Sequence, residues 1–319
     1  MAHHLLIALV ALTIDRLAGY PDAIYRRVGH PVSWMGRFIA WLDERLNRPA
    51  ARDARLRGVV ALTMLLLVVL FVALAIGVFT GLSQWGVVAK SAAAATLLAQ
   101  RSLADHVKAV ADALAHSIER GRATVRKIVG RDTAQLDESG VAKAAIESLA
   151  ESLSDGVVAP LFWLAIAGLP GIALYKAVNT ADSMIGHLDP RYRHFGWAAA
   201  RLDDLLNLVP ARLTGLLIAL AALVASGKTE AGRALSIMHK DAGKHRSPNA
   251  GYPEAAMAGA LGLSLGGPRA YAGETINLPS FGDGVLLASG QHIADALRLY
   301  RIVLNALLVT IIALLAVSA

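Results

Sequence analysis

The stretch "GVVALTMLLLVVLFVALAIGVFT", residues 58–80, decides the fold class of this protein. It carries no charge and is longer than the roughly 20 apolar residues that an α-helix needs to cross a bilayer. The chain just before it is rich in arginine, at Arg37, Arg45, Arg48, Arg52, Arg55 and Arg57. Because basic residues favour the cytoplasmic side of a membrane helix, residues 15–57 are predicted to be cytoplasmic.

The composition extends this prediction to the whole chain. The protein is 55% hydrophobic and 17% charged, against about 45–50% and about 25% in soluble domains. The predicted membrane segments are 5–14, 58–80, 156–175, 209–227 and 302–319. We therefore predict an all-α, polytopic integral membrane protein with about four or five membrane-inserted segments and a cytoplasmic helical layer. Residues 1–319 are predicted to form a single membrane-embedded domain.

Two polar regions and one interrupted run complete this outline. Residues 101–146 show a helical period, with one apolar face made by Leu103, Val107, Val110, Leu114 and Ile118. Residues 228–301 are polar and glycine-rich, and no strand pattern is visible there. The run 156–175 contains "AGLPG" at 167–171, where glycine and proline can break a helix. It is either one kinked span or a helical hairpin that enters and returns on the same side.

Several classes of chemistry are excluded by what the sequence lacks. There is no cysteine, so no disulfide, thiolate nucleophile or cysteine-ligated metal is available. The net charge of +7 comes with arginines beside apolar runs, and no nucleic-acid partner is expected. "ALVASGKT" (222–229) resembles a phosphate-binding loop, but Ala222 replaces its first glycine and an apolar helical run precedes it.

One acidic stripe is the first candidate site. "ESLAESLSDG" (147–156) places Glu147, Glu151 and Asp155 four residues apart, on one face of a helix. Like charges at this spacing destabilise a helix by about 0.2–0.5 kcal/mol per pair. Bound Mg²⁺ would offset that cost, since it binds through one or two carboxylates plus substrate phosphates. The alternative is a solvated helix face.

Two further polar clusters stand beside apolar runs, in "YKAVNTADSMIGH" (175–187) and "RLDDLLNLVPAR" (201–212). The candidate residues in them are Asn179, Asp182, Asp203 and Asn207. Polar groups near bilayer depth usually face a cavity or a partner, so these favour a functional site. The alternatives are a helix-end capping cluster for the first and a membrane-interface anchor for the second.

Two basic segments could hold phosphate. "HKDAGKHRSPNAGYPEAAMAGAL" (239–261) contributes Lys244, Arg246 and Asn249, and "VGRDT" (129–133) contributes Arg131 next to a glycine. A basic loop on the membrane surface is the alternative for the first segment.

Together these segments resemble the adenosylcobinamide-phosphate synthase family of cobalamin biosynthesis, the CobD/CbiB family. The matching stretches are "GHPVSWMGRFIAWLDERLNR" (29–48), "IVGRDTAQLDESGVAKAAIESLAESLSDGVVAPLFW" (128–163), "YKAVNTADSMIGH" (175–187), "RLDDLLNLVPARLTG" (201–215) and "SPNAGYPEAAMAGALGLSLGGP" (247–268). One departure is "GYP" (19–21), where family members usually read "GDP". If that aspartate contributes to the site in the family, either Asp15 or Asp22 replaces it here, or its role is not essential.

The resemblance implies a multi-pass enzyme of the bacterial inner membrane, with its active site facing the cytoplasm. It would join adenosylcobyric acid to (R)-1-amino-2-propanol O-phosphate, or a related amino-alcohol phosphate, giving adenosylcobinamide phosphate. ATP and Mg²⁺ are the implied cofactors. The two substrates and the lipid bilayer are the expected partners, and a homo-oligomer remains one alternative for the assembly.

Residue types and motif positions then suggest roles. The predicted metal ligands are Glu147, Glu151 and Asp155. The predicted catalytic residues are Glu147, Glu151, Asp182 and Asp203, the last two as further ligands or as a base for the ammonium group. The predicted phosphate and substrate contacts are Arg131, Lys244 and Arg246, with Asn179, Asn207 and Asn249 orienting amides or hydroxyls.

Two rival functions come from other classes. Buried carboxylates and broken helices also suit an ion- or proton-coupled transporter. Against this, the chain shows no paired halves with matching interrupted helices. A non-catalytic membrane scaffold is the second rival, and it would not need the acidic clusters.

Overall fold

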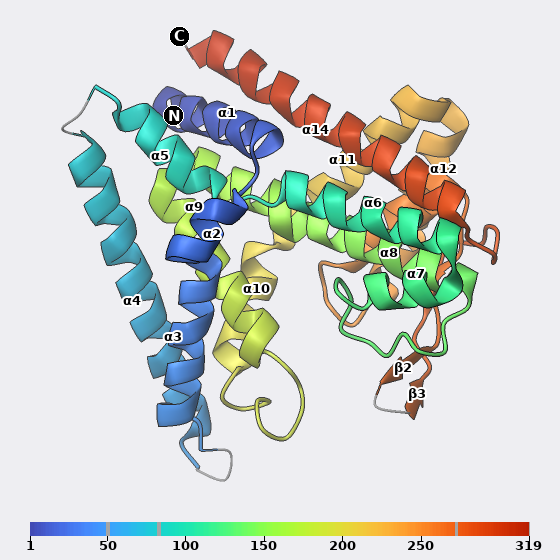
Figure 1. Cartoon of the computed structure of the whole chain (residues 1–319), viewed down its shortest axis with the longest axis horizontal. Coiled ribbons are helices and arrows are strands. Elements are labelled where there is room, and N and C mark those ends of the chain that lie inside the picture. The colour runs from blue at the N-terminus through green and yellow to red at the C-terminus, as the bar shows by residue number, and fades with distance from the viewer. Residues whose placement is uncertain (49–51, 82–83, 272–273, 319) are drawn as a thin grey trace. The chain divides into compact units, whose positions relative to one another are not determined.

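The structure, a computed structural model, describes residues 1–48, 52–81, 84–271 and 274–318 and is mostly helical, with almost no strand (Figure 1). This confirms the predicted all-α class. Within these described residues, four helical stretches are long and apolar enough to cross a membrane: Ala54–Gly81, Glu138–Ile185, Leu208–Ser226 and Gly290–Ser318. A fifth span is obtained if Ala2–Leu17 and Asp22–Leu46, which are bent by 104° at their junction, count as one. The segment 5–14 predicted from the sequence lies in this bent pair.

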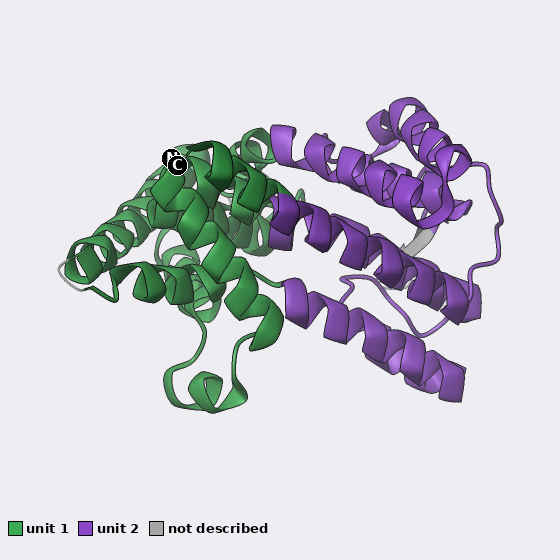
Figure 2. Cartoon of the chain, turned by 90° about the horizontal axis from the view of Figure 1, so that it is seen from above, with its two compact units in different colours: residues 1–99, 159–207, 310–319 green, residues 100–158, 208–309 purple. Residues whose placement is uncertain are grey.

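The chain divides into two compact units, coloured separately in Figure 2. Unit 1 contains residues 1–99, 159–207 and 310–319, and unit 2 contains residues 100–158 and 208–309. Both are discontinuous in sequence, and the single membrane-embedded domain over residues 1–319 stays a prediction.

The helices of unit 1 are α1 (Ala2–Leu17), α2 (Asp22–Val28), α3 (Pro31–Leu46), α4 (Ala54–Gly81), α5 (Gly86–Ala95), α9 (Ala159–Ile185) and α10 (Trp197–Leu206). Those of unit 2 are α6 (Gln100–His116), α7 (Ile118–Val125), α8 (Glu138–Leu153), the π-helical turn η1 (Ser154–Val158), α11 (Leu208–Ser226), α12 (Lys228–Asp241), the 3₁₀ turn η2 (Ala242–Lys244) and α13 (Gly251–Leu261). The last helix, α14 (Gly290–Ser318), belongs to unit 2 up to residue 309.

Unit 1 is organised around α9, which packs against α1, α3, α4, α5 and α10. Small residues allow some of these close approaches. A side chain at Gly58, near the start of α4, would collide with the backbone carbonyl of Phe195 just before α10. The close fit of backbone to backbone at this point therefore requires glycine.

Helix α9 is broken inside the predicted segment 156–175. Gly168 has φ 65° and ψ −154°, a conformation that glycine adopts without the Cβ clash of other residues, and Pro170 follows it. A side chain at Gly171 would collide with the carbonyl oxygen of Trp163. Along a continuous helix, residues eight apart are separated by about 12 Å. The chain thus turns a sharp corner here, which both a kinked span and a re-entrant helical hairpin would contain.

Unit 2 is built from helices that pack around small and branched apolar residues. Helix α8 packs against α6, α7 and α13, and α11, α12 and α13 pack against one another. The predicted apolar face of residues 101–146 is confirmed for Leu103, Val107, Val110 and Leu114, which are all buried in α6. Ile118 does not continue it, because α6 ends at His116 and Ile118 begins α7, where it is only half-buried. Helix α13, "GYPEAAMAGAL", is buried along almost its whole length, since alanine and glycine let its neighbours approach closely.

Short strands follow α13, where the sequence showed no strand pattern. Strand β1 (Leu265–Gly266) pairs with β4 (Ser280–Phe281), and β2 (Arg269–Tyr271) pairs with β3 (Glu274–Ile276), both antiparallel. Strands of two or three residues are too short to produce a detectable alternation. They matter here because β1 contacts α8, which carries the acidic stripe.

Candidate functional site

A hydrogen-bonded polar cluster in unit 1 joins the end of α9 to α10. Asp203, only 9% exposed, accepts hydrogen bonds from the side-chain amides of Asn179 (3.3 Å) and Asn207 (3.0 Å). The Tyr175 hydroxyl donates to Asn207 Oδ1 at 2.9 Å, and Lys176 Nζ donates to Asn179 Oδ1 at 3.4 Å. The structure therefore brings together three residues that the sequence placed in two separate motifs.

The pKa of Asp203 is raised to about 7 by its surroundings. Burial is the main cause, because it disfavours the charged form, and the nearby negative charge of Asp182 adds to it. The hydrogen bonds from Asn179 and Asn207 act in the opposite direction but are weaker. A carboxyl group with this pKa can both accept and release a proton near neutral pH.

In unit 2, the first acid of the stripe forms a buried ion pair. Glu147 Oε2 accepts a hydrogen bond from Arg131 at 2.9 Å, and the two side chains are 6% and 9% exposed. Glu147 Oε1 accepts the backbone N–H of Gly266 in β1 at 2.7 Å. This carboxylate thus connects α8 to the "VGRDT" loop and to β1.

The other two acids of the stripe have different surroundings. Glu151 is exposed in the last turn of α8, and Asp155 is half-buried in the π-helical turn η1. The sequence predicted uniform α-helical spacing, but the wider π turn begins at Ser154. Such turns are uncommon and are frequently found at functional sites.

An arginine-lined pocket of about 640 Å³ lies at the loop predicted to clamp phosphate. Its basic residues are Arg122, Arg126 and Arg131, and Asp132 and Thr133 also line it. Arg122 already donates to the carbonyl of Leu136 at 2.6 Å, and Arg131 has a buried Nε atom that makes no hydrogen bond. A planar guanidinium matches phosphate oxygens well, so the charge and size of this pocket suit a phosphate-bearing ligand.

The basic segment 239–261 is held by buried groups of its own. Lys244 pairs with Asp241 at 2.6 Å, and Asp241 also accepts the backbone N–H of Gly282 at 2.8 Å. Burial opposes ionisation of Asp241, but these two donors outweigh it, so its pKa is lowered. Lys244 and Arg246 are exposed.

Asn249 is buried in the same segment and does not face solvent. Its Oδ1 accepts from Arg212 at 3.4 Å, and the Arg212 guanidinium lies 4.1 Å above the ring of Tyr252. The structure therefore ties Asn249 to α11. Its predicted role, to orient a substrate group, remains a prediction.

The fit of the acidic residues to Mg²⁺ differs from one acid to the next. In the described ranges, no three or more His, Cys, Asp or Glu side chains are grouped closely enough to hold one ion. Mg²⁺ does not require such a group, since it keeps several waters and uses one or two carboxylates with substrate phosphates. Glu151 is exposed and Asp155 is half-buried, so a hydrated ion can reach them, whereas Glu147 is buried in its pair with Arg131.

Several residues of these clusters were not among the predicted site residues. Tyr175, Arg122, Arg126, Asp241 and Glu254 are those that the structure adds. Glu254, 2% exposed in α13, lies 3.7 Å from His245 Nε2, while His245 Nδ1 accepts the backbone N–H of Ser247 at 2.9 Å. An acid inside a stretch of alanine and glycine was a usable signal, because charged residues are rarely fully buried without a partner.

Comparison with known proteins gives one consistent family. A family model described as "CobD/Cbib protein" matches residues 8–300. A "Cobalamin biosynthesis protein CobD" from Sinorhizobium sp is 51% identical over 301 residues, covering 93% of each chain. Proteins of the same name from Rhodobacter capsulatus and Brucella suis biovar 1 are 50% and 49% identical, covering 92% of this chain and 91% and 89% of theirs. No solved structure matches the chain.

Proposed function

The chain belongs to the CobD/CbiB family and acts in cobalamin biosynthesis, and we propose that it is the ATP-dependent ligase of that family. In this proposal it joins adenosylcobyric acid to (R)-1-amino-2-propanol O-phosphate, or a related amino-alcohol phosphate. The product is adenosylcobinamide phosphate. The enzyme works in the bacterial inner membrane with its site facing the cytoplasm.

The reaction needs an activation step, because a carboxylate oxygen is a poor leaving group. A carboxylate oxygen of adenosylcobyric acid forms a bond to the γ-phosphorus of ATP as ADP leaves. The amine nitrogen then attacks the acyl carbon, the carbon–oxygen bond to phosphate breaks, and inorganic phosphate is released. The substrate nitrogen, which enters as an ammonium group, loses one proton before it attacks and a second as the amide forms, so a base must be present.

The arginine-lined pocket is the observation that carries this proposal. Phosphoryl transfer depends mainly on positioning and on neutralising charge. Arg122, Arg126 and Arg131 supply positive charge around one pocket in unit 2, and Lys244 and Arg246 are further proposed phosphate contacts. Mg²⁺, when bound, would neutralise charge on the phosphoryl group, with Glu151 and Asp155 as preferred ligands ahead of Glu147.

Asp203 is the proposed base for the ammonium group of the amine substrate. Its pKa of about 7 suits it to take a proton at neutral pH. Asn179 and Asn207 fix the orientation of the Asp203 carboxylate. Asp182, one turn after Asn179 in α9, helps to raise the pKa of Asp203. Asp182 therefore acts through Asp203 in this proposal, as a positioning residue.

The decisive assay uses the full chain purified in detergent. ATP cleavage to ADP and phosphate should require both adenosylcobyric acid and the amino-alcohol phosphate, and mass spectrometry should detect adenosylcobinamide phosphate. ATP cleavage that proceeds at the same rate when either substrate is left out would contradict the proposal. Coupled ion uptake by vesicles, with no product formed, would instead support the transporter, which family membership does not favour.

Arg126→Ala should raise the KM for ATP about tenfold, because a charge-assisted hydrogen bond is worth about 1.5–3 kcal/mol. Arg126 is exposed at the pocket, so its loss should not unfold the protein. Arg120→Ala is the matched control, since Arg120 is exposed on neighbouring α7 and does not line the pocket. Equal KM values in the two variants would remove this pocket from the ATP site.

A further inference from the structure

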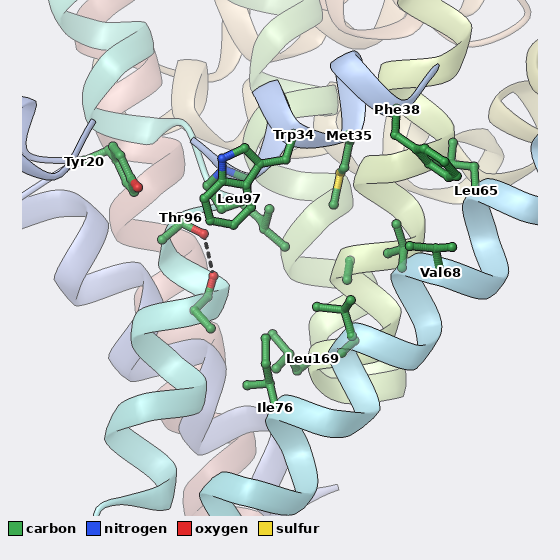
Figure 3. Close-up of a pocket in the computed structure, with 16 residues that line it drawn as sticks. Tyr20, Trp34, Met35, Phe38, Leu65, Val68, Ile76, Thr96, Leu97 and Leu169 are labelled. Atoms are coloured by element: carbon green, nitrogen blue, oxygen red, sulfur yellow. Dashed lines mark hydrogen bonds between the residues drawn. The ribbon is translucent and has the colours of Figure 1, made fainter. Parts of the chain in front are cut away.

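A second pocket, in unit 1, has a different character from the arginine-lined one. It has a volume of about 380 Å³, within the roughly 300–1,000 Å³ of small-molecule pockets. Figure 3 shows side chains of α3, α4, α5 and α9 converging on it. Its principal lining residues are Trp34, Phe38, Leu65, Ile76, Leu97 and Leu169.

The few polar groups in this lining already have partners within the protein. The Tyr20 hydroxyl donates to the carbonyl of Gly29 at 2.6 Å, and Trp34 Nε1 donates to the carbonyl of Val28 at 3.0 Å. Thr96 Oγ1 donates to the carbonyl of Ala93 at 2.7 Å, the bond drawn in Figure 3. A polar ligand would lose hydrogen bonds to water on entering this lining, whereas a hydrocarbon chain would lose none.

The pocket runs along α4, a helix that is long and apolar enough to cross a membrane. Its α4 residues extend from Leu65 to Ile76, a rise of about 16 Å. That length is close to half of the roughly 30 Å hydrocarbon thickness of a bilayer, the depth of one leaflet. Other side chains of α4, including Leu67 and Phe71, are exposed, as expected of a helix surrounded by lipid.

Basic residues at the ends of α3 and α4 indicate how deep in the bilayer this pocket lies. Arg45 lies 5.7 Å from the ring of Trp41, and Arg55 lies 5.5 Å from the ring of Trp197. Tryptophan and arginine at helix ends mark the headgroup level, where the cations can meet lipid phosphates. Leu65 is ten residues beyond Arg55, about 15 Å along the helix, which is hydrocarbon depth.

From these observations we propose that the unit 1 pocket binds one acyl chain of a membrane phospholipid. An acyl chain is apolar, as the lining of the pocket is. It also has about the length of the pocket and lies at the same depth in the bilayer. A corrinoid or a nucleotide does not fit, because its amide carbonyls and phosphates would find no free side-chain donor in this lining. The inference is independent of the proposed reaction, since none of the proposed catalytic residues lines this pocket.

The test compares two substitutions on one helix. Ala73→Phe places a ring in the pocket, because Ala73 lines it, and Ala75→Phe is the control, because Ala75 lies two residues away and does not. The probe is phosphatidylglycerol with brominated acyl chains, added to the full chain in detergent. The measured quantity is the quenching of Trp34 fluorescence by bromine. It is obtained by subtracting the quenching in the Trp34→Phe form of each protein.

We expect saturable quenching of Trp34 in the wild type and in Ala75→Phe. In Ala73→Phe, half-maximal quenching should need about tenfold more brominated lipid, because most of the buried apolar contact is lost. If Ala73→Phe fails to fold, Val72→Phe at the exposed edge of the pocket replaces it. Quenching that does not saturate, or that is equal in the pocket variant and the control, would overturn the proposal. So would displacement of the lipid by adenosylcobyric acid or ATP.

Discussion

At the scale of single residues, two carboxylates show how the surroundings of a side chain set its chemistry. Asp203 lies among two amides and a second acid, and it holds its proton up to about pH 7. Glu147 is equally buried, but it faces Arg131 and a backbone N–H. The first is suited to proton transfer, whereas the second is suited to holding two segments together.

Asp182→Asn should move the acidic limb of the pH–rate profile below its wild-type position near pH 7. The reason is that Asp182 raises the pKa of Asp203 by charge repulsion. Asn179→Ala should move the limb upward, since it removes a hydrogen bond that favours the carboxylate. The measurement is kcat/KM for the amine between pH 5 and 9, about two units either side of that pKa. If the acidic limb of the pH–rate profile stays at its wild-type position in both variants, Asp203 is not the base.

Arg131→Met should lower the free energy of unfolding by about 3–5 kcal/mol, because it leaves a buried charge without its partner. Arg131→Met combined with Glu147→Met should cost much less, since no buried charge remains. Thermal or denaturant unfolding in detergent would measure both. If the double variant loses at least as much stability as Arg131→Met alone, the two side chains are not coupled. Glu147 would then be better explained as a metal ligand.

At the scale of elements, the interruption of α9 is the clearest departure from regular helix. Gly168 takes a positive φ, and Gly171 lies against the carbonyl oxygen of Trp163. The corner lets the second arm of α9 carry Tyr175, Asn179 and Asp182 to α10. A straight helix would carry these side chains in another direction.

Gly168→Ala should therefore destabilise unit 1 by about 1–2 kcal/mol, because alanine disfavours a positive φ. Its Cβ would also lie 3.0 Å from His4 Nε2, a tight contact. Gly77→Ala in α4 is the control, since its Cβ would meet no atom within 4 Å. Thermal unfolding should separate the two variants, and equal melting temperatures would mean that the corner relaxes without cost.

At the scale of the whole molecule, the sequence predicts one cytoplasmic face for all the polar clusters. The chain contains no native cysteine, so single cysteines can be introduced one at a time. Cysteines replacing Ser152 and Arg201, both in the polar clusters, should react with a membrane-impermeant maleimide only in inside-out vesicles. A cysteine replacing Gly77, inside α4, should react in neither orientation. Labelling of the first two from opposite sides would contradict the proposed cytoplasmic site.

The sequence by itself determined the helical class, the apolar runs, the motifs and the family resemblance. These features depend on local composition and spacing, such as the uncharged 58–80 run and the buried face of α6. Hydrophobic length and helical period are encoded within about 20 neighbouring residues, so they can be read without tertiary contacts.

Only the tertiary structure decided which polar residues meet. It paired Arg131 with Glu147, joined Asn179 and Asn207 to Asp203, and added Tyr175. It also placed a π turn at Asp155 and a corner at Gly168. These outcomes depend on contacts between distant segments and on burial. A pKa or an ion pair follows from the surroundings of a group, and the residue type alone does not specify them.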